Sequence, residues 1–250
     1  MPGTETGSGT ETGSVSVGVR REWQRAELVA AWPQTDSARS LRFRVPGWAP
    51  QLPGQHCLVR LTAPDGYTAQ RSYSIASTAS TPELIEVVIE RLADGEVSPH
   101  LHDVLAPGDA VEVRGPFGGH FIWSGGSPVA LIGGGSGVAP LMAMLRCWRE
   151  RDRPVPLRMV VSVRAPEQLW FAGEYGAETT VVYTRQAPPG WPRPPGRLDA
   201  PAISAALAGL PPETTAYVCG SHGFAEHASR LLVQTGWVPA DIRIERFGPS

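Results

Sequence analysis

The segment from Gly133 to Pro140 (Gly-Gly-Gly-Ser-Gly-Val-Ala-Pro) constrains the fold more than any other part of the chain. It separates the apolar run Val129–Ile132 from a helical pattern that begins at Pro140. Glycine is costly inside a helix or strand, so the spacing predicts a strand, a tight turn and a helix. Glycines let a backbone approach an anion, and the free N–H groups at a helix start favour a pyrophosphate. Val138 stands where the GxGxxG fingerprint needs its third glycine, so a tight turn without a ligand remains an alternative.

Strands and helices alternate through the second half of the chain. The expected strands are Val129–Ile132, Met159–Val163, Thr180–Tyr183, Ala216–Cys219 and Ile242–Ile244, and the expected helical segments are Pro140–Trp148, Pro166–Phe171, Ala200–Leu207 and Phe224–Gln234. This alternation predicts a doubly wound α/β domain with a five-stranded parallel sheet over residues 125–250.

The first half shows short apolar or alternating runs between Pro/Gly turns. The runs are Ala26–Ala31, Leu41–Val45, His56–Leu61, Ser72–Ala76, Leu84–Ile89 and Ala110–Val113. They predict a six-stranded antiparallel β-barrel over residues 15–124, with one helix that starts at Ser98-Pro99 and runs through Leu105. The repeated Gly-Thr-Glu-Thr-Gly-Ser at the start predicts a disordered tail over residues 1–14.

Composition excludes several functional classes. The formal charge is −2 and the aromatic residues are not interleaved with basic ones, which argues against nucleic acid as a partner. Gly115–Leu145 has no charged residue, but Gly and Pro interrupt it, so we expect no membrane span. Three scattered cysteines predict neither a disulfide framework nor a zinc site, and the histidine pairs are not spaced as metal ligands. With no visible signal peptide, we expect a cytoplasmic protein without a bound metal.

Arginines follow the second and third predicted strands of the parallel sheet. Arg164 ends one strand, and Thr184-Arg185 ends the next. An arginine at this place suits the 2′-phosphate of NADP better than NAD, although ordinary surface arginines are the alternative. Arg193 and Arg197 lie in the Pro-rich loop that follows and are candidates to join them.

Cys219-Gly-Ser-His-Gly223 joins a predicted strand to a helix. A hydrolase places its serine nucleophile in such a turn, but Cys219 occupies the position that needs glycine, so a hydrolase built on Ser221 is a weak alternative. Cys219 lies at the carboxyl edge of the sheet, where open α/β folds bind ligands, and it is equally expected as a plain buried thiol.

Five motifs together resemble the ferredoxin–NADP reductase family, in the family's order. They are Arg71-Ser72-Tyr73-Ser74, the segment from Arg91 to Ser98 with Gly95, the loop Gly133–Pro140, the pair Cys219-Gly220, and Glu245-Arg-Phe247-Gly. The resemblance covers residues from about 15 to 250 and implies a flavin-binding barrel followed by a nicotinamide-nucleotide domain.

The resemblance implies roles for the flavin motifs, with FAD as the expected flavin. Arg71 would pair with the pyrophosphate, Tyr73 would lie against the isoalloxazine, and Ser74 would bond near N5. Val97 and Ser98 would present backbone N–H groups to the same pyrophosphate. The remaining residues of the two motifs that we assign to flavin binding are Ser72, Arg91 and Gly95.

The resemblance likewise implies roles in the second domain. The loop would hold the pyrophosphate of the nicotinamide nucleotide, with Cys219 near the nicotinamide ring. Glu245 matches the acid of the family's terminal acid-x-aromatic pattern. The candidate catalytic residues are Ser74, Cys219 and Glu245. Phe247 would cover the flavin, although Gly248-Pro-Ser250 follows it whereas in plant-type enzymes the aromatic is last. The assigned nucleotide-binding residues are Gly134, Gly135, Ser136, Gly137, Val138, Arg164, Thr184, Arg185, Cys219 and Gly220.

The expected activity is transfer of hydride from NADPH, favoured over NADH, to FAD N5. The chain lacks the C-x4-C-x2-C run of a [2Fe–2S] domain, so electrons would pass to a separate acceptor such as a ferredoxin, a flavodoxin or an oxygenase component. The alternatives are an NADH-dependent reductase component of an oxygenase and a non-catalytic flavin-binding subunit of a larger complex. We expect a monomer or weak dimer.

Overall fold

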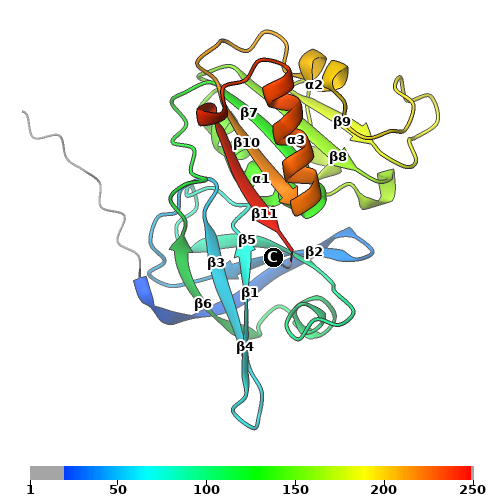
Figure 1. Ribbon diagram of the computed structural model, residues 1–250. Coiled ribbons are helices and arrows are strands. Elements are labelled where there is room, and N and C mark those ends of the chain that lie inside the picture. The colour runs from blue at the N-terminus through cyan, green and yellow to red at the C-terminus, as the bar shows by residue number, and fades with distance from the viewer. Residues whose placement is uncertain (1–19, 249–250) are drawn as a thin grey trace, which may run out of the picture.

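The computed structural model describes residues 20–248, which form an antiparallel barrel and a parallel sheet flanked by helices (Figure 1). This is the predicted two-domain architecture. The predicted tail at residues 1–14 lies outside the described residues. Within them, no helix is both long enough and apolar enough to cross a membrane.

The barrel is a six-stranded antiparallel sheet in the order β4-β3-β6-β1-β2-β5. Its strands are β1 (Arg20–Thr35), β2 (Ala38–Arg44), β3 (His56–Thr62), β4 (Thr68–Ser74), β5 (Leu84–Glu90) and β6 (Ala110–Phe117). A bridge between Ile75 and Val87 joins the two edge strands just beyond β4 and so closes the sheet.

Side-chain alternation produces the barrel's core. On β2, Leu41 and Phe43 are fully buried while Arg42 and Arg44 are exposed, because successive residues of a strand point to opposite faces. The long β1 pairs with β6 through its first half and with β2 through its second half, so one strand spans two neighbours.

The predicted helix after Ser98 is one short turn, η1 (His100–Val104), with π-type hydrogen bonding. Ser98 is not its cap, which corrects the prediction. Pro99 stands at the N-cap position, and the Ser98 hydroxyl accepts a hydrogen bond from the Leu92 N–H at 3.1 Å. The Ser98 hydroxyl therefore stabilises the turn between Leu92 and Ser98 and does not cap η1.

The parallel sheet has five strands in the order β11-β10-β7-β8-β9. These are β7 (Val129–Gly134), β8 (Leu157–Val163), β9 (Thr179–Tyr183), β10 (Thr215–Ser221) and β11 (Ile242–Phe247). The helices are α1 (Val138–Glu150), α2 (Ala200–Ala206) and α3 (His222–Gln234). The predicted helical turn at Pro166–Phe171 contains the 3-10 turn Pro166–Gln168, and a second 3-10 turn, Ala172–Glu174, follows it. Helix α1 packs on one face of the sheet, and α2 and α3 pack on the other.

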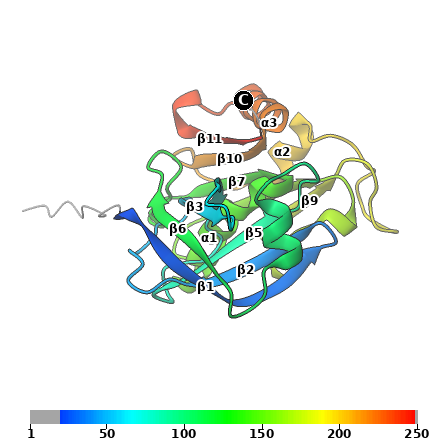
Figure 2. The ribbon, with the colours of Figure 1, turned by 90° about the horizontal axis from the view of Figure 1, so that it is seen from below.

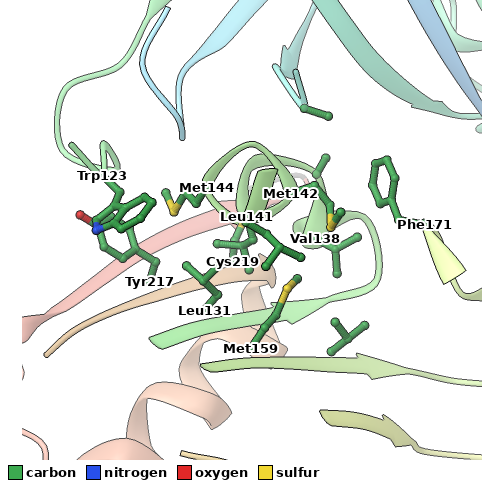
Figure 3. Close-up of a cluster of buried hydrophobic side chains, with 14 of the residues drawn as sticks. Trp123, Leu131, Val138, Leu141, Met142, Met144, Met159, Phe171, Tyr217 and Cys219 are labelled. Atoms are coloured by element: carbon green, nitrogen blue, oxygen red, sulfur yellow. The ribbon is translucent and has the colours of Figure 1, made fainter. Parts of the chain in front are cut away.

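One apolar cluster continues from the α1 face of the sheet into the barrel. Figure 3 shows its part around α1, where Leu141 lies in the middle of the cluster and Met142 lies near Val138, on the side of Phe171. Ala76 and Val88 of the barrel belong to the same cluster. Figure 1 shows the barrel below the layer that holds α1, and the view from below in Figure 2 shows the barrel in front of that layer. The two domains therefore share buried apolar surface.

Candidate functional site

The glycine loop has the conformation that its sequence predicts. Strand β7 ends at Gly134, a 3-10 turn covers Gly135–Gly137, and α1 starts at Val138. Gly135 has a φ of +55°, and no atom lies within 4 Å of the place that a Cβ would take. Its outer face is open, as a backbone that cradles an anion requires.

The inner side of the loop is packed against β10. A Cβ on Gly137 would overlap the Cys219 carbonyl oxygen, and one on Gly134 would lie 2.5 Å from the Phe224 ring. Val138, which breaks the GxGxxG spacing, is buried in the cluster around α1. A side chain is accepted there because it points into the core. The loop thus fits a bound pyrophosphate on its exposed side.

Two predicted site residues, Cys219 and Glu245, lie side by side near the carboxyl ends of parallel strands. In register, Cys219 of β10 pairs with Gly133 of β7 on one side and with Glu245 of β11 on the other. Cys219 is fully buried, and burial together with the nearby Glu245 charge raises the pKa of its thiol well above the ordinary value. Burial also raises the pKa of Glu245 to about 7. The site therefore holds an unionised thiol beside a carboxyl group that titrates near neutrality.

Phe247 is the last residue of β11 and lies opposite Ser221 in register. Its ring is half-buried against the cluster around α1. In Figure 1 the end of β11 points toward the barrel. Ser221 itself caps α3 by accepting a bond from the Phe224 N–H at 3.4 Å, so its hydroxyl has a structural partner.

The motif Arg71–Ser74 forms the last part of β4. Arg71 is exposed and pairs with Glu96 at 3.1 Å, and the Tyr67 hydroxyl donates to the other oxygen of that carboxylate at 2.9 Å. Tyr73 packs against the barrel core, and burial raises its pKa to about 12. Ser74 is buried at the strand's end. A guanidinium that is exposed on an edge strand fits a phosphate group.

A cavity of about 580 Å³ adjoins this motif. Glu96, the partner of Arg71, and Tyr67, which bonds Glu96, are part of its wall. The wall also includes apolar side chains from Leu61, Ala69 and Val111. The cavity therefore extends along β4 from Arg71 away from Ser74. A cofactor longer than a mononucleotide could be accommodated in this direction.

The second flavin motif lies beside η1. Gly95 is tightly enclosed, because a Cβ there would lie 2.8 Å from the Ser98 hydroxyl. Val97 and Ser98 are buried. The Arg91 guanidinium bonds Asp103 at 2.7 Å. The role of Arg91 in flavin binding stays a prediction.

The two arginines after β8 and β9 are brought together by backbone hydrogen bonds. The Arg185 N–H donates to the Arg164 carbonyl at 2.9 Å, and the Thr184 N–H donates to Val163 at 2.8 Å. Both arginine side chains are exposed at the carboxyl edge of the sheet. Arg193, by contrast, pairs with Asp199 at 2.8 Å. Arg164 and Arg185 therefore form the better candidate site for a phosphate.

Sequence reasoning missed Arg146 on α1. Its guanidinium donates to the Ala76 carbonyl at 2.9 Å and pairs with Glu86 and Glu174. Arg146 is the first charged residue after the uncharged stretch Gly115–Leu145. The available signal was a charge between the buried residues Leu145 and Cys147 of α1, because a buried charge needs partners.

Comparisons with known proteins find matches to both halves of the chain. A family model for the oxidoreductase FAD-binding domain matches residues 26–122, and one for the oxidoreductase NAD-binding domain matches residues 131–230. The propane 2-monooxygenase reductase component of Mycolicibacterium smegmatis is 31% identical over 60% of this chain and 43% of that protein. The ferredoxin–NAD(P)(+) reductase CarAd of Metapseudomonas resinovorans is 31% identical over 86% of this chain and 66% of that protein.

Among solved structures, the Amycolatopsis cytochrome P450 reductase GcoB has a TM-score of 0.79 at 24% identity, over 97% of this chain and 74% of that one. This likeness shows a shared fold. The chain spans between about a third and two thirds of the length of the curated relatives that it matches. Both cofactor-domain models match in the expected order and together cover well over half of the sequence. The chain therefore belongs to the ferredoxin–NADP reductase-like flavoproteins, in which an FAD-binding domain precedes an NAD-binding domain.

Proposed function

We propose that this chain is an FAD-dependent NAD(P)H reductase that takes a hydride from the nicotinamide nucleotide and passes electrons to a separate protein acceptor. One observation carries the proposal: the two cofactor motifs lie on elements that touch. Helix α1 begins at the glycine loop, and its Arg146 bonds Ala76, two residues beyond Ser74 of the flavin motif. When bound, FAD supplies the redox chemistry by accepting a two-electron hydride and releasing electrons singly.

The barrel residues would hold FAD along β4. Arg71 would exchange its Glu96 partner for the pyrophosphate, while Tyr73 and Ser74 would contact the flavin ring. The cavity beside Tyr67 supports a dinucleotide, because the adenosine half must extend from Arg71 in the direction opposite to the flavin. Val97 and Ser98 would add to the phosphate contacts through their backbone.

The second domain would bind and orient the nucleotide. The exposed side of the loop at Gly135 would receive the pyrophosphate, and buried Cys219 would exclude water beside the nicotinamide. Glu245, with a pKa of about 7, would hold or release a proton at its carboxyl oxygens. We place the domain boundary at residues 124 and 125, between the two matched family models.

We further propose NADPH as the preferred donor, because Arg164 and Arg185 lie together and exposed at the edge of the sheet. We propose that the acceptor is an oxygenase component or a ferredoxin, since the relatives include reductase components of propane 2-monooxygenase and a ferredoxin–NAD(P)(+) reductase. The proposed setting is cytoplasmic, as a monomer or weak dimer.

The test is an anaerobic absorption spectrum of the purified protein, loaded with FAD, before and after adding NADPH or NADH in separate cuvettes. Rapid bleaching of the flavin band by either nucleotide supports the reductase proposal. A retained flavin that neither nucleotide bleaches would point to a flavin-binding subunit, and failure to take up FAD would remove the proposal.

Arg185→Ala decides the donor preference. We expect its affinity for NADPH to fall by about 10-fold or more, because a charged hydrogen bond to a phosphate contributes roughly 1.5–3 kcal/mol, while its affinity for NADH stays unchanged. Arg230→Ala, an exposed arginine on the outer side of α3, is the matched control. Equal losses for both nucleotides in Arg185→Ala would contradict a role in 2′-phosphate recognition.

A further inference from the structure

Arg146 is the centre of a polar network that crosses from one domain to the other. From α1 it donates to the Ala76 carbonyl at 2.9 Å and pairs with Glu86 of β5 at 3.3 Å. On its own domain it bonds both carboxylate oxygens of Glu174, one of them at 2.8 Å. The guanidinium lies 5.2 Å from the centre of the Phe171 ring.

The network closes on itself through β1 and β2. The Phe171 N–H donates across the interface to the Gln34 side chain at 2.7 Å. Gln34 then donates to Ser40 at 2.9 Å, and Ser40 donates to Glu86 at 3.3 Å. The Glu174 N–H returns to the Phe171 carbonyl at 2.8 Å. These bonds form a closed polar network. Two separate contacts of the network join the domains: one is made by the Arg146 guanidinium and the other by the Phe171 N–H.

The central charged groups of this network are largely buried. The Glu86 side chain is 1% exposed and that of Arg146 is 19% exposed. Burial alone would lower the pKa of Arg146, but bonds and charges from Glu174 and Glu86 raise it, so the guanidinium stays charged. A buried charge pair contributes little net stability compared with apolar residues of similar volume. Its hydrogen bonds weaken steeply when the angle at the hydrogen departs from linear, so they restrict how the two domains can be placed.

We propose that Arg146 is a positioning residue that sets the separation between the flavin motif and the nucleotide loop. The position of Arg146 between the two motifs supports this role. Ala76 follows Ser74 by two residues, and the loop Gly133–Pro140 leads into the helix that carries Arg146. Holding reacting atoms in line is the main task of such an enzyme, and a misplacement of about 1 Å can cost roughly 100-fold in rate. The inference rests on the proposed reductase function.

Phe171 supports the same conclusion. It has a φ of +56°, a backbone conformation that a bulky residue adopts at a cost. The Gln34 bond and the Arg146 guanidinium over its ring hold it in that conformation. Strain of this kind persists where surrounding contacts over-determine the backbone.

The first experiment compares Arg146→Gln with Arg149→Gln in the FAD-loaded full chain. Arg149 is the matched control, because it lies one turn away on α1 and pairs with a buried carboxylate, Glu178, within its own domain. We expect at least a tenfold slower flavin reduction at saturating nucleotide for Arg146→Gln, with unchanged nucleotide Kd, and wild-type rates for Arg149→Gln. Equal rates for the two variants would overturn the inference.

A double variant separates positioning from stability. Arg146→Gln alone leaves the buried Glu86 with Arg42, at 3.2 Å, as its remaining charge partner, which destabilises the fold. Glu86→Gln with Arg146→Gln removes both charges of the buried pair. We expect the double variant to regain most of the lost stability and to remain slow. Recovery of the rate together with the stability would show a merely structural role.

Chemical rescue adds a specific readout. A cavity of about 410 Å³ borders Arg146, Glu86 and Glu174, so a small cation can reach the position of the guanidinium. In Arg146→Ala, millimolar guanidinium chloride should restore part of the reduction rate, and sodium chloride at equal ionic strength should not. Equal responses to both salts would count against the proposed contact.

Amide hydrogen exchange at Phe171 tests the network without the cofactor. In the full chain without FAD, the Phe171 N–H should exchange at least tenfold faster in Arg146→Gln than in Arg149→Gln or the wild type. Unchanged protection would overturn the proposed coupling between Arg146 and the domain contact. If the wild type takes up FAD but is not reduced, the reductase proposal fails, while this exchange experiment still decides whether Arg146 holds the domains.

Discussion

At the scale of single residues, the candidate site contains one exposed ion pair and one pair of largely buried titratable groups. Arg71 and Glu96 are each about half exposed, so their ion pair contributes little to stability. Glu245 and Cys219 are largely buried, and their titration is coupled to the fold. Substitution of Arg71 should therefore alter FAD binding, and substitution of Glu245 should alter how the stability of the fold depends on pH.

Arg71→Ala should lose FAD while the protein stays folded. We expect FAD affinity to fall roughly 10- to 100-fold, because a charged bond to a phosphate contributes about 1.5–3 kcal/mol. Titration of the apoprotein with FAD, followed by flavin fluorescence, measures the loss. Arg158→Ala, an exposed arginine on β8, is the control and should bind FAD normally. Full retention of FAD by Arg71→Ala would remove the assignment of Arg71.

Because of Glu245, the free energy of unfolding should fall as the pH rises. Its pKa is about 7 in the folded chain and 4.5 in the unfolded one, so between these values the folded state binds more protons. The stabilisation is complete below pH 4.5 and is lost as pH rises through 7. Its maximum is roughly 3 kcal/mol, because a tenfold difference between the two acid dissociation constants corresponds to about 1.36 kcal/mol. Denaturant unfolding of the wild type and Glu245→Gln from pH 5 to 8 measures it. Parallel stability curves would contradict a buried carboxyl group at this place.

At the scale of elements, the glycine loop depends on the strand beside it. Gly137→Ala should destabilise the fold by about 1–3 kcal/mol or more and weaken nucleotide binding, because its Cβ would overlap the Cys219 carbonyl. Thermal unfolding and nucleotide titration check both effects. Gly223→Ala in α3 meets no atom within 4 Å and should be neutral or stabilising by up to about 1 kcal/mol. A neutral Gly137→Ala would mean that the loop can move away from β10.

Elements with a strong local pattern were predictable. Apolar runs with regular alternation between turns indicated all six barrel strands, and the glycine loop indicated the β7–α1 junction. The turn at Ser98 was predicted wrongly, because its hydroxyl has two possible uses and the Leu92 N–H, six residues earlier, is the donor that it meets. The length of β1 was underestimated, because its outer parts are ordered by pairing with β2 and β6.

At the scale of the whole molecule, the two domains are joined by apolar packing as well as by the polar ring at Arg146. The linker between them is part of this packing. The Phe121 ring meets Tyr217 edge-on at 5.2 Å, and the Tyr217 hydroxyl donates to the Ile122 carbonyl at 2.7 Å. Arg243 of β11 donates to the same carbonyl at 3.0 Å. The linker is thereby fastened to β10 and β11.

Trp123→Ala should therefore destabilise both domains together. Trp123 is 1% exposed and belongs to the cluster that spans the interface, so we expect a loss of about 3–5 kcal/mol. Denaturant unfolding followed by far-UV circular dichroism and by tyrosine fluorescence reports on the whole chain. Trp191→Ala, in a loop and 37% exposed, is the control and should lose less than about 1 kcal/mol. Similar losses for both would place Trp123 outside the shared core.

The sequence by itself determined the order of barrel and parallel sheet, the glycine loop, and the motifs that identify the family. These features are local, because hydrophobic period, turn chemistry and short motifs act over neighbouring residues. The tertiary structure alone decided that Cys219 lies beside Glu245 and that Arg146 reaches Ala76 and Glu86, 70 and 60 residues away in the chain. Such contacts depend on how separate elements pack, and a residue pattern within one element does not contain that information.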